Sequence, residues 1–276
     1  MESYLLIGHI AHDEIPNGAK LGGTVSYSGS TVAALGGTVR IVTSARRDDE
    51  VLNELPASVN LHLIDAPKST TFVNTYIGDT RRQLLLGRAA APLTFKDIPT
   101  EWRDTPVVHL APLDDEVDPE LATAFPNSFV AATAQGWMRA WDAEGVVRPK
   151  VWEDAERLLP ILDLVVFSEE DIGRDVALEA HYAALAKRLI VTRAANGCTI
   201  YQRGEQTMHL PAPQVEVVDA TGAGDVFAGV FYVYYYRTGN VLQAAQIATY
   251  LASQSVTRVG LAGVPQPQEI QAALNQ

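Results

Sequence analysis

The chain has 276 residues, of which 47% are hydrophobic and 20% are charged, so it can bury a large core as one α/β domain or as one domain with a small accessory part. A formal net charge of -12 excludes a general nucleic-acid binder, because phosphate backbones are bound by concentrated Lys and Arg. No apolar run reaches the roughly 18 residues of a membrane span. We therefore expect a small-molecule ligand, and neither a nucleic acid nor a membrane as partner.

The N-terminus and the cysteine content indicate a cytoplasmic protein. Cys198 is the only cysteine, so no internal disulfide can form. The first ten residues, MESYLLIGHI, lack the basic region and the long apolar core of a secretion signal.

Short apolar runs alternate with helical patterns along the chain, which predicts a mostly parallel sheet covered by helices. Ligands of such sheets bind at the carboxyl ends of the strands. The predicted strands are 4–7, 40–43, 107–110, 129–132, 164–167 and 189–192, and the predicted helices are 30–35, 152–159, 179–187, 226–236 and 242–257.

One part of the first third departs from this alternation. Residues 71–77 alternate strictly between apolar and polar side chains, and Gly78-Asp79 then predicts a two-residue hairpin turn into 80–84. Asn17-Gly18 is a second hairpin signal. We predict a small antiparallel lid that closes over a site, although ordinary edge strands give the same pattern. The lid lies within about 14–27 and 69–88, with Phe72, Asn74 and Tyr76 on one face and Val73 and Ile77 on the other.

The segment Asp219-Ala-Thr-Gly-Ala-Gly-Asp225 stands directly before the apolar run 226–236. Its two glycines let backbone N–H groups converge at a helix start, where the helix dipole also favours an anion. A carboxylate at such a place, Asp225, suits a reaction that removes a proton while phosphate charge is held nearby, which indicates phosphoryl transfer. On the residues alone, Asp225 as a helix cap stays an alternative.

Other site motifs are absent from the sequence. The chain has no P-loop motif, no Gly-x-Gly-x-x-Gly dinucleotide fingerprint, no His-Glu-x-x-His and no Gly-x-Ser-x-Gly elbow. His9 and His12 have no third metal ligand at a suitable spacing, so we interpret them as structural or substrate-facing residues.

Residues 219–225 resemble the C-terminal signature of the ribokinase-like (PfkB-type) carbohydrate kinase family. Gly22-Gly23, followed by Ala33-Ala34-Leu35-Gly36, is similar to the N-terminal signature of that family. The order of these motifs also matches, and the resemblance covers nearly the whole chain. It implies a three-layer α/β/α fold with a mostly parallel central sheet and a small antiparallel β lid, in a single kinase domain over residues 1–276.

The resemblance implies roles for the residues at these motifs. Asp225 would accept the proton of the attacking hydroxyl, while the amides of Gly222, Ala223 and Gly224 hold the transferred phosphoryl group. Asp13 would bind substrate hydroxyls, although a turn-forming role explains it as well. The backbone of Gly22 and Gly23 would approach the same ligand. The implied cofactors are ATP and Mg²⁺, and a monovalent cation stays open.

The resemblance also places the nucleotide against the late helix 244–257. Small side chains there permit close approach of an adenine, and helix packing explains them equally well. Ala194 departs from the glycine that is frequent in the nucleotide-contacting turn. The implied nucleotide-binding residues are Thr192, Arg193, Gly197, Thr221, Ala252 and Gly260.

Two further positions differ from the usual motifs of the family, one in the predicted acceptor site and one in the predicted metal site. Tyr27 stands where many members have a substrate-binding asparagine, which indicates an aromatic wall in the substrate pocket. Ser168-Glu169-Glu170-Asp171 stands where an Asn-x-x-Glu motif is usual. Asp171 could orient a hydrated Mg²⁺, or it could belong to an acidic start of a surface helix.

Gln135-Gly-Trp-Met-Arg139 resembles a stretch found in the branch of the family that contains inositol kinases, which implies a polyol substrate. Gln135 would hydrogen-bond the substrate, and Arg139 would neutralise phosphate charge. Alternatively, Trp137 and Met138 are core residues and Arg139 pairs with Asp142 on the surface. Arg82 in the lid is a further phosphate or hydroxyl contact, or a solvated strand residue.

The sequence therefore predicts an ATP-dependent kinase for the hydroxyl of a sugar or a cyclitol. A nucleoside kinase and a catalytically silent ligand-binding homologue are the alternatives. The predicted partners are the small-molecule substrate and ATP, with a monomer or a homodimer formed through the lid.

Overall fold

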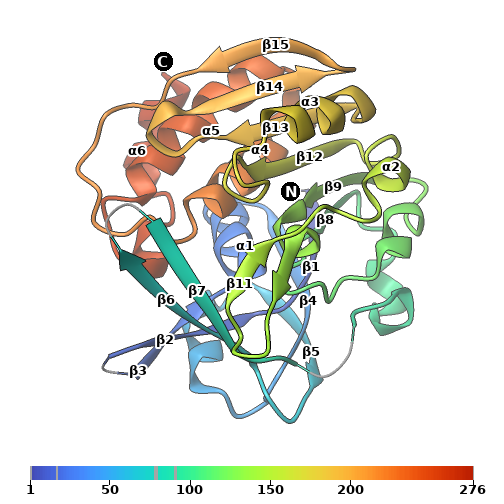
Figure 1. Ribbon diagram of the computed structural model, residues 1–276, viewed down its shortest axis with the longest axis vertical. Helices are drawn as coiled ribbons and strands as arrows, with labels where there is room; N and C mark the ends of the chain where they lie inside the picture. Colours follow the sequence, from blue (N-terminus) through green and yellow to red (C-terminus); the bar gives the residue numbers. More distant parts are fainter. Residues whose placement is uncertain (1, 17, 78–79, 90–91, 276) are drawn as a thin grey trace.

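A nine-stranded sheet forms the centre of the protein, and its strand order is β15-β14-β13-β12-β9-β8-β1-β4-β5. The computed structural model (Figure 1) describes residues 2–16, 18–77, 80–89 and 92–275. All pairings from β5 to β13 are parallel, and β14 and β15 add an antiparallel edge. The strands are β1 (Ser3–Ile7), β4 (Thr38–Ala45), β5 (Asn60–Asp65), β8 (Val107–Leu110), β9 (Phe129–Thr133), β12 (Leu164–Ser168), β13 (Arg188–Thr192), β14 (Cys198–Gln202) and β15 (Glu205–Leu210).

Helices cover both faces of this sheet and make three layers. Along β1, Tyr4 and Leu6 join a core with α1, α4 and α5, whereas Leu5 and Ile7 join a second core with α2 and α3. This alternation follows from side chains pointing to opposite faces of a strand. The helices are α1 (Thr24–Ala34), α2 (Ala155–Leu158), α3 (Val176–Leu185), α4 (Ala223–Thr238), α5 (Val241–Ser255) and α6 (Pro267–Leu274). The 3-10 helices are η1 (Glu50–Glu54), η2 (Phe95–Asp97), η3 (Thr100–Trp102), η4 (Pro119–Thr123), η5 (Ala134–Met138), η6 (Ala194–Asn196) and η7 (Gly260–Gly263).

The predicted three-layer α/β/α fold and all six predicted strands are confirmed. The apolar run 226–236 lies in α4, which is buried from Val226 to Tyr234. None of the described helices combines the length and the apolar character that a membrane crossing requires. The helix predicted at 30–35 begins earlier, at Thr24, because its first turns bury serines and threonines that do not register as an apolar stripe.

A second sheet with strand order β3-β2-β6-β7 stands off the main sheet (Figure 1). Two antiparallel hairpins form it, and a parallel pairing of β2 with β6 joins them. We call this four-stranded sheet the lid sheet. Its strands are β2 (Ala11–Ile15), β3 (Gly18–Gly22), β6 (Thr70–Ile77) and β7 (Thr80–Gly87), and a short hairpin of β10 (Arg139–Trp141) and β11 (Val147–Pro149) lies beside β7.

The predicted lid boundaries need one correction. Residues 24–27, which the predicted segment 14–27 includes, form the first turn of α1 instead. Gly23 causes the change of direction, because its φ of 91° turns the chain out of β3 and into the helix. Phe72 packs in a small core with Ala11, Leu85 and Leu113. The turn residues Asn17 and Gly78-Asp79 and the side chains of Tyr76 and Ile77 lie outside the described parts.

Candidate active site

A cavity of about 570 Å³ lies at the carboxyl ends of the parallel strands, where the lid sheet faces the start of α4. Ser168 at the end of β12 and Thr192 at the end of β13 line it, as expected for a site of a parallel sheet. Fourteen of the seventeen predicted site residues line it, namely Asp13, Gly23, Tyr27, Gln135, Arg139, Asp171, Thr192, Gly197, Thr221, Gly222, Ala223, Gly224, Asp225 and Ala252. Gly22, Arg193 and Gly260 are not part of the lining.

Residues 219–225 form the loop that leads into α4, and we call them the anion loop. Gly222 is the N-cap of the helix, with a left-handed φ of 79°. A β-carbon at Gly222 would lie 2.3 Å from Cδ1 of Tyr27, so only glycine fits this position. The N–H groups of the first turn have no helical acceptor and carry the positive end of the dipole of a 16-residue helix. The amide of Ala223 already makes a long turn bond of 3.3 Å to the carbonyl of Ala220.

Asp225 is half-buried in the first turn of α4 and lines the cavity. Its backbone carbonyl accepts a 2.7 Å hydrogen bond from the Oγ of Ser28 in α1, which fixes this turn. Asp225 is not the N-cap residue of α4, because Gly222 occupies that position. The carboxylate therefore lies at the positive end of a helix and at the wall of a cavity.

Asp13 lies on β2 of the lid sheet, lines the cavity and is 5% exposed. A β-carbon at Gly22 would lie 2.3 Å from Oδ2 of Asp13. Gly22 thus makes room for this carboxylate, and the predicted approach of its backbone to the ligand stays a prediction. Gly23 does line the cavity, and its positive φ aims the chain into α1.

Gln135 and Asp171 form a pair on the cavity wall. The Nε2 of Gln135 donates to Oδ1 of Asp171 at 3.0 Å, and the N–H of Ser168 donates to Oδ2 at 2.8 Å. Both oxygens of Asp171 therefore have protein partners, as in a carboxylate that caps a turn. The pair also leaves the Gln135 carbonyl oxygen as an acceptor in the cavity.

Arg139 is buried, with only 8% of its surface exposed. Its Nη1 donates to the carbonyl of Leu113 at 3.2 Å, and its guanidinium lies 5.9 Å from the ring centroid of Phe72. The alternative surface pair with Asp142 is wrong, because Asp142 binds Arg148 instead. Trp137 and Met138 are buried in the core, as that alternative proposed.

Three of the predicted nucleotide-binding residues have identifiable structural partners, namely Arg193, Gly197 and Gly260. Arg193 binds Glu169 and Glu179, so its guanidinium does not reach the cavity, which corrects its predicted role in cofactor binding. Gly197 is required by packing, since its φ is 83° and a β-carbon would lie 1.9 Å from the Leu210 carbonyl. Gly260 donates its N–H to Asp219 at 3.1 Å and lies behind the anion loop.

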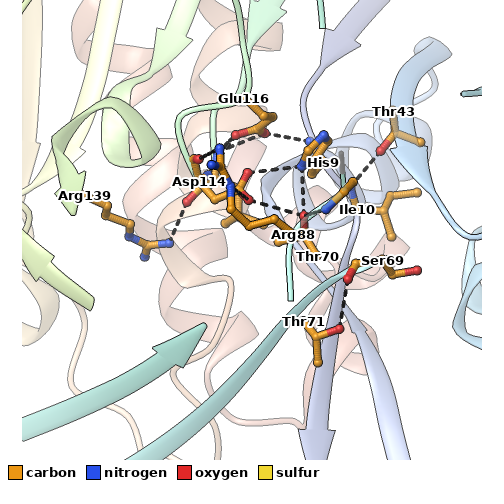
Figure 2. Close-up of polar contacts among 12 residues, drawn as sticks. His9, Ile10, Thr43, Ser69, Thr70, Thr71, Arg88, Asp114, Glu116 and Arg139 are labelled. Atoms are coloured by element: carbon orange, nitrogen blue, oxygen red, sulfur yellow. Dashed lines mark hydrogen bonds and ion pairs between the residues drawn. The ribbon is translucent and has the colours of Figure 1, made fainter. Parts of the chain in front are cut away.

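A cluster of polar and charged residues lies where the chain passes between the main sheet and the lid sheet (Figure 2). It consists of His9, Thr70, Arg88, Asp114 and Glu116, which we call the hinge network, and all but Arg88, whose side chain is 43% exposed, are buried. Nδ1 of His9 lies 3.1 Å from Asp114, and Nε of Arg88 donates to the other oxygen of Asp114 at 3.0 Å. Figure 2 shows Arg139 joined to the loop that carries these carboxylates.

Glu116 accepts hydrogen bonds from the backbone N–H groups of His9, Leu113 and Asp114. Burial raises the pKa of Glu116 to about 7. Burial opposes the charged form of His9 as well, but the nearby carboxylates of Glu116 and Asp114 raise its pKa. Burial thus works against the charged form of Glu116, while the neighbouring carboxylates favour the charged form of His9.

No sequence pattern predicts this cluster, because His9 lies 61 residues from Thr70 and 105 residues from Asp114. The expectation that no third metal ligand accompanies His9 is wrong in geometry, since His9, Asp114 and Glu116 offer ligand atoms within 4.8 Å of one another. The chemistry nevertheless favours a structural network. Arg88 supplies the positive charge that a metal ion would bring, and three backbone N–H groups occupy Glu116.

The sequence matches the pfkB family carbohydrate kinase profile over residues 120–268, which is more than half of the chain and includes the anion loop. The chain belongs to the pfkB family of carbohydrate kinases. A member of this family is a phosphotransferase that acts on an alcohol group of a sugar or polyol.

Relatives and solved structures agree with this assignment. The chain is 27% identical to inositol 3-kinase of Zea mays over 93% of this chain and 73% of that protein. It is 27% identical to the bifunctional protein HldE of Caulobacter sp. (strain K31) over 83% of this chain, and this match spans only 50% of HldE. Among solved structures, a pyrophosphate-dependent kinase of the ribokinase family, complexed with a pyrophosphate analog and myo-inositol, has a TM-score of 0.81 at 22% identity and covers 98% of this chain and 99% of that one. Ribokinase from Thermotoga maritima has a TM-score of 0.76 at 21% identity over 100% of both chains.

Proposed function

We propose that this pfkB-family protein is an ATP-dependent kinase that phosphorylates a hydroxyl group of a sugar or a cyclitol. One observation carries the proposal. The anion loop with Asp225 lines the same cavity as the polar side chains of Asp13, Gln135 and Arg139. This arrangement brings a donor phosphate and an acceptor hydroxyl together beside a carboxylate.

The proposed reaction transfers the γ-phosphoryl group of ATP to the substrate hydroxyl, with Asp225 as the proton acceptor. The substrate hydroxyl oxygen attacks the γ-phosphorus, a new oxygen–phosphorus bond forms, and the bond between the γ-phosphorus and the bridging oxygen of ADP breaks. The hydroxyl proton passes to the carboxylate of Asp225. Amides of the anion loop, at the positive end of α4, stabilise the charge on the transferred group.

The acceptor side of the cavity suits a ligand with several hydroxyl groups. Asp13 accepts hydrogen bonds from hydroxyls, while Gln135 can accept through its carbonyl oxygen. The Tyr27 ring supplies an apolar wall for a carbon ring. The similarity to inositol 3-kinase of Zea mays supports a cyclitol, and a nucleoside remains the alternative acceptor.

The donor side supports ATP. Small apolar side chains line the cavity beyond the anion loop and suit a flat base, for which pyrophosphate has no counterpart. They are Ala194, Ala195, Ala212, Pro213, Val215, Ala252 and Val256. Pyrophosphate is the second candidate donor, because a kinase of that specificity shares this fold.

Mg²⁺ would be held by phosphate oxygens of the donor, by water and by carboxylates of the cavity wall. Glu170 and Asp171 both line the cavity, and Asp171 is oriented by Gln135 and by the Ser168 amide. Bound there, Mg²⁺ would neutralise phosphate charge. Replacing Asp171 with Asn should raise the Mg²⁺ concentration needed for half-maximal activity, whereas an unchanged requirement would remove Asp171 from the metal site.

We further propose that residues 1–276 act as one kinase domain and that the lid sheet closes over the acceptor. Asp13 belongs to the lid sheet and lines the cavity, so closure would deliver a substrate ligand to the anion loop. Analytical ultracentrifugation would distinguish a monomer from a homodimer through the lid.

The decisive experiment is an acceptor panel of cyclitols, sugars and nucleosides, run with Mg²⁺ and with either ATP or pyrophosphate. The proposal predicts a phosphorylated cyclitol or sugar with ATP, identified by mass spectrometry. Phosphorylation from pyrophosphate alone would contradict the donor. Tight ligand binding without any phosphorylated product would favour the silent homologue.

A further inference from the structure

An ion pair joins the lid sheet to the anion loop. Nζ of Lys20, on β3, lies 2.8 Å from Oδ2 of Asp219, the first residue of the loop. The two side chains are only 20% and 13% exposed. Partial burial and a charge-assisted hydrogen bond make this pair stronger than an ordinary surface ion pair.

The carboxylate of Asp219 also holds two backbone segments. Oδ1 accepts the N–H of Thr221 at 2.9 Å, and Oδ2 accepts the N–H of Gly260 at 3.1 Å. The N–H of Asp219 itself donates to the carbonyl of Val256, directly after α5. One carboxylate therefore connects the lid sheet, the anion loop and the segment between α5 and α6.

This carboxylate is ionised in the folded protein. Burial opposes its charge, but Lys20 and the N–H groups of Thr221 and Gly260 outweigh that effect and lower the pKa of Asp219 to about 2. The Asp219 carboxylate is therefore charged at neutral pH.

The side chains of Lys20 and Tyr27 lie near Gly260, beside the ion pair. A β-carbon on Gly260 would lie 3.8 Å from Cδ of Lys20 and 3.9 Å from the hydroxyl of Tyr27. The ring of Tyr27 in turn fills the space beside Gly222, where a β-carbon would clash. The stem of Lys20, the ring of Tyr27 and the backbone of Gly260 thus support the loop from one side.

We propose that Lys20 and Asp219 are positioning residues that hold the anion loop in its phosphate-binding conformation, and that the Lys20 ammonium takes the place of a monovalent cation at this carboxylate. The inference rests on the proposed kinase function, since it assumes that the loop binds a donor phosphate. It assigns the role of a cation, left open by the sequence, to a side chain of the lid sheet.

The charge of the Lys20 ammonium explains how it could replace a monovalent cation. The ammonium of Lys20 and a bound potassium ion carry the same charge and compete for the same carboxylate oxygen. With Lys20 present, the donor affinity of the wild-type protein should not depend on potassium. With Lys20 replaced by Met, which keeps most of the stem, the loop should need a cation from solution.

Donor binding without acceptor tests the inference by calorimetry, with Mg²⁺ and either ATP or pyrophosphate, in potassium or tetramethylammonium buffers. The wild type should bind its preferred donor equally in both buffers. Lys20→Met should bind it about tenfold to a hundredfold more weakly in tetramethylammonium, the usual range for a lost bond to a charged group, and should recover part of this loss in potassium. Lys20→Arg should bind almost normally.

Lys68→Met serves as the matched control, since Lys68 is an exposed lysine just before β6 and outside the cavity. Thermal unfolding of each variant separates loss of the fold from loss of the loop geometry. Unchanged donor affinity of folded Lys20→Met, or a loss that potassium does not restore, would overturn the positioning role. If the wild type bound neither ATP nor pyrophosphate, the proposed function would fail, and the inference with it.

Discussion

The anion loop and the hinge network are both polar regions at the base of the lid sheet, and they balance donors and acceptors in opposite ways. In the hinge network, Arg88 and three backbone N–H groups satisfy the buried carboxylates of Asp114 and Glu116. In the anion loop, a helix start directs N–H groups toward a cavity, where the first turn provides no acceptors for them. Buried carboxylates that accept from protein donors stabilise a fold, whereas a helix start with surplus N–H donors binds an anion.

The carboxylates of the two regions also differ in whether they line the active-site cavity. Glu116 and Asp114 are about 1% exposed and are not among the residues that line the described active-site cavity, while Asp225 and Asp13 both line it. Substitutions in the anion loop should therefore change turnover with little change in stability. Substitutions in the hinge network should lower stability with little change in turnover.

The largest effect is expected for Asp225→Asn. Asparagine keeps the size of the side chain and cannot accept the hydroxyl proton, so kcat should fall by about a hundredfold to ten-thousandfold. Steady-state kinetics would measure kcat, and thermal unfolding would measure the stability of the variant. Asp175→Asn is a suitable control, because Asp175 caps α3 outside the cavity and asparagine caps equally well. Turnover of Asp225→Asn within a few-fold of the wild type would remove this residue from the mechanism.

Arg139→Met should have the next largest effect, chiefly on acceptor binding. Loss of a charged donor from the cavity wall should raise the KM for the acceptor by about tenfold to a hundredfold, with a smaller change in the KM for the donor. Arg157→Met is the control, since Arg157 is a surface residue paired with Asp154 and Glu120. A KM that rises only for the donor would instead place Arg139 on the phosphate side.

Glu116→Gln tests the hinge network. The amide group of glutamine would face backbone N–H groups, so the free energy of unfolding should fall by about 1–3 kcal/mol, while kcat changes only a few-fold. Urea denaturation would measure this loss, with the exposed Glu120→Gln as control. A large loss of kcat without loss of stability would show that the hinge network acts in catalysis.

The pH dependence of stability is the smallest expected effect. The pKa of Glu116 is raised from its usual 4.5 to about 7, so the folded protein keeps a proton that the unfolded chain releases. This contribution to stability is full below pH 4.5 and is lost as the pH rises through about 7. His9, whose pKa is also raised, adds to the decline above its usual 6.5.

Burial lowers the pKa of His109 to about 3, which makes stability rise with pH up to about 6.5 and offsets the Glu116 effect there. Denaturation of the wild type from pH 6.5 to 8 should therefore show a falling free energy of unfolding. Glu116→Gln should show a shallower decline over this range, because the contribution of Glu116 is removed. A wild-type free energy that rises over this range would contradict the assigned charges.

The sequence predicted most of the fold, because apolar strands and turn residues are local signals. The six central strands, the buried helix α4 and the hairpin of β6 with β7 are all visible as patterns within a few residues. The start of α1 was predicted too late, since its first turns bury Thr24, Ser26 and Ser28, whose hydroxyl groups obscure the apolar period.

The parts of the site that are contiguous in the sequence were predictable, and the parts that join residues distant in the chain were not. The glycines and Asp225 of the anion loop form a contiguous motif, and the structure places them on one cavity wall. The hinge network joins His9 to residues 61 and 105 positions away, so no pattern in the sequence reveals it. Arg193 looked like a nucleotide contact, and its actual partner Glu179 lies on a separate helix.

One measurement tests the central claim most directly. Wild-type protein and Asp225→Asn are incubated with Mg²⁺, with ATP labelled at the γ-phosphate, and with the cyclitol and sugar panel, and labelled product is identified by mass spectrometry. We expect a labelled phosphomonoester from the wild type and almost none from the variant. Equal amounts of labelled product from both proteins would contradict an anion loop that works through Asp225.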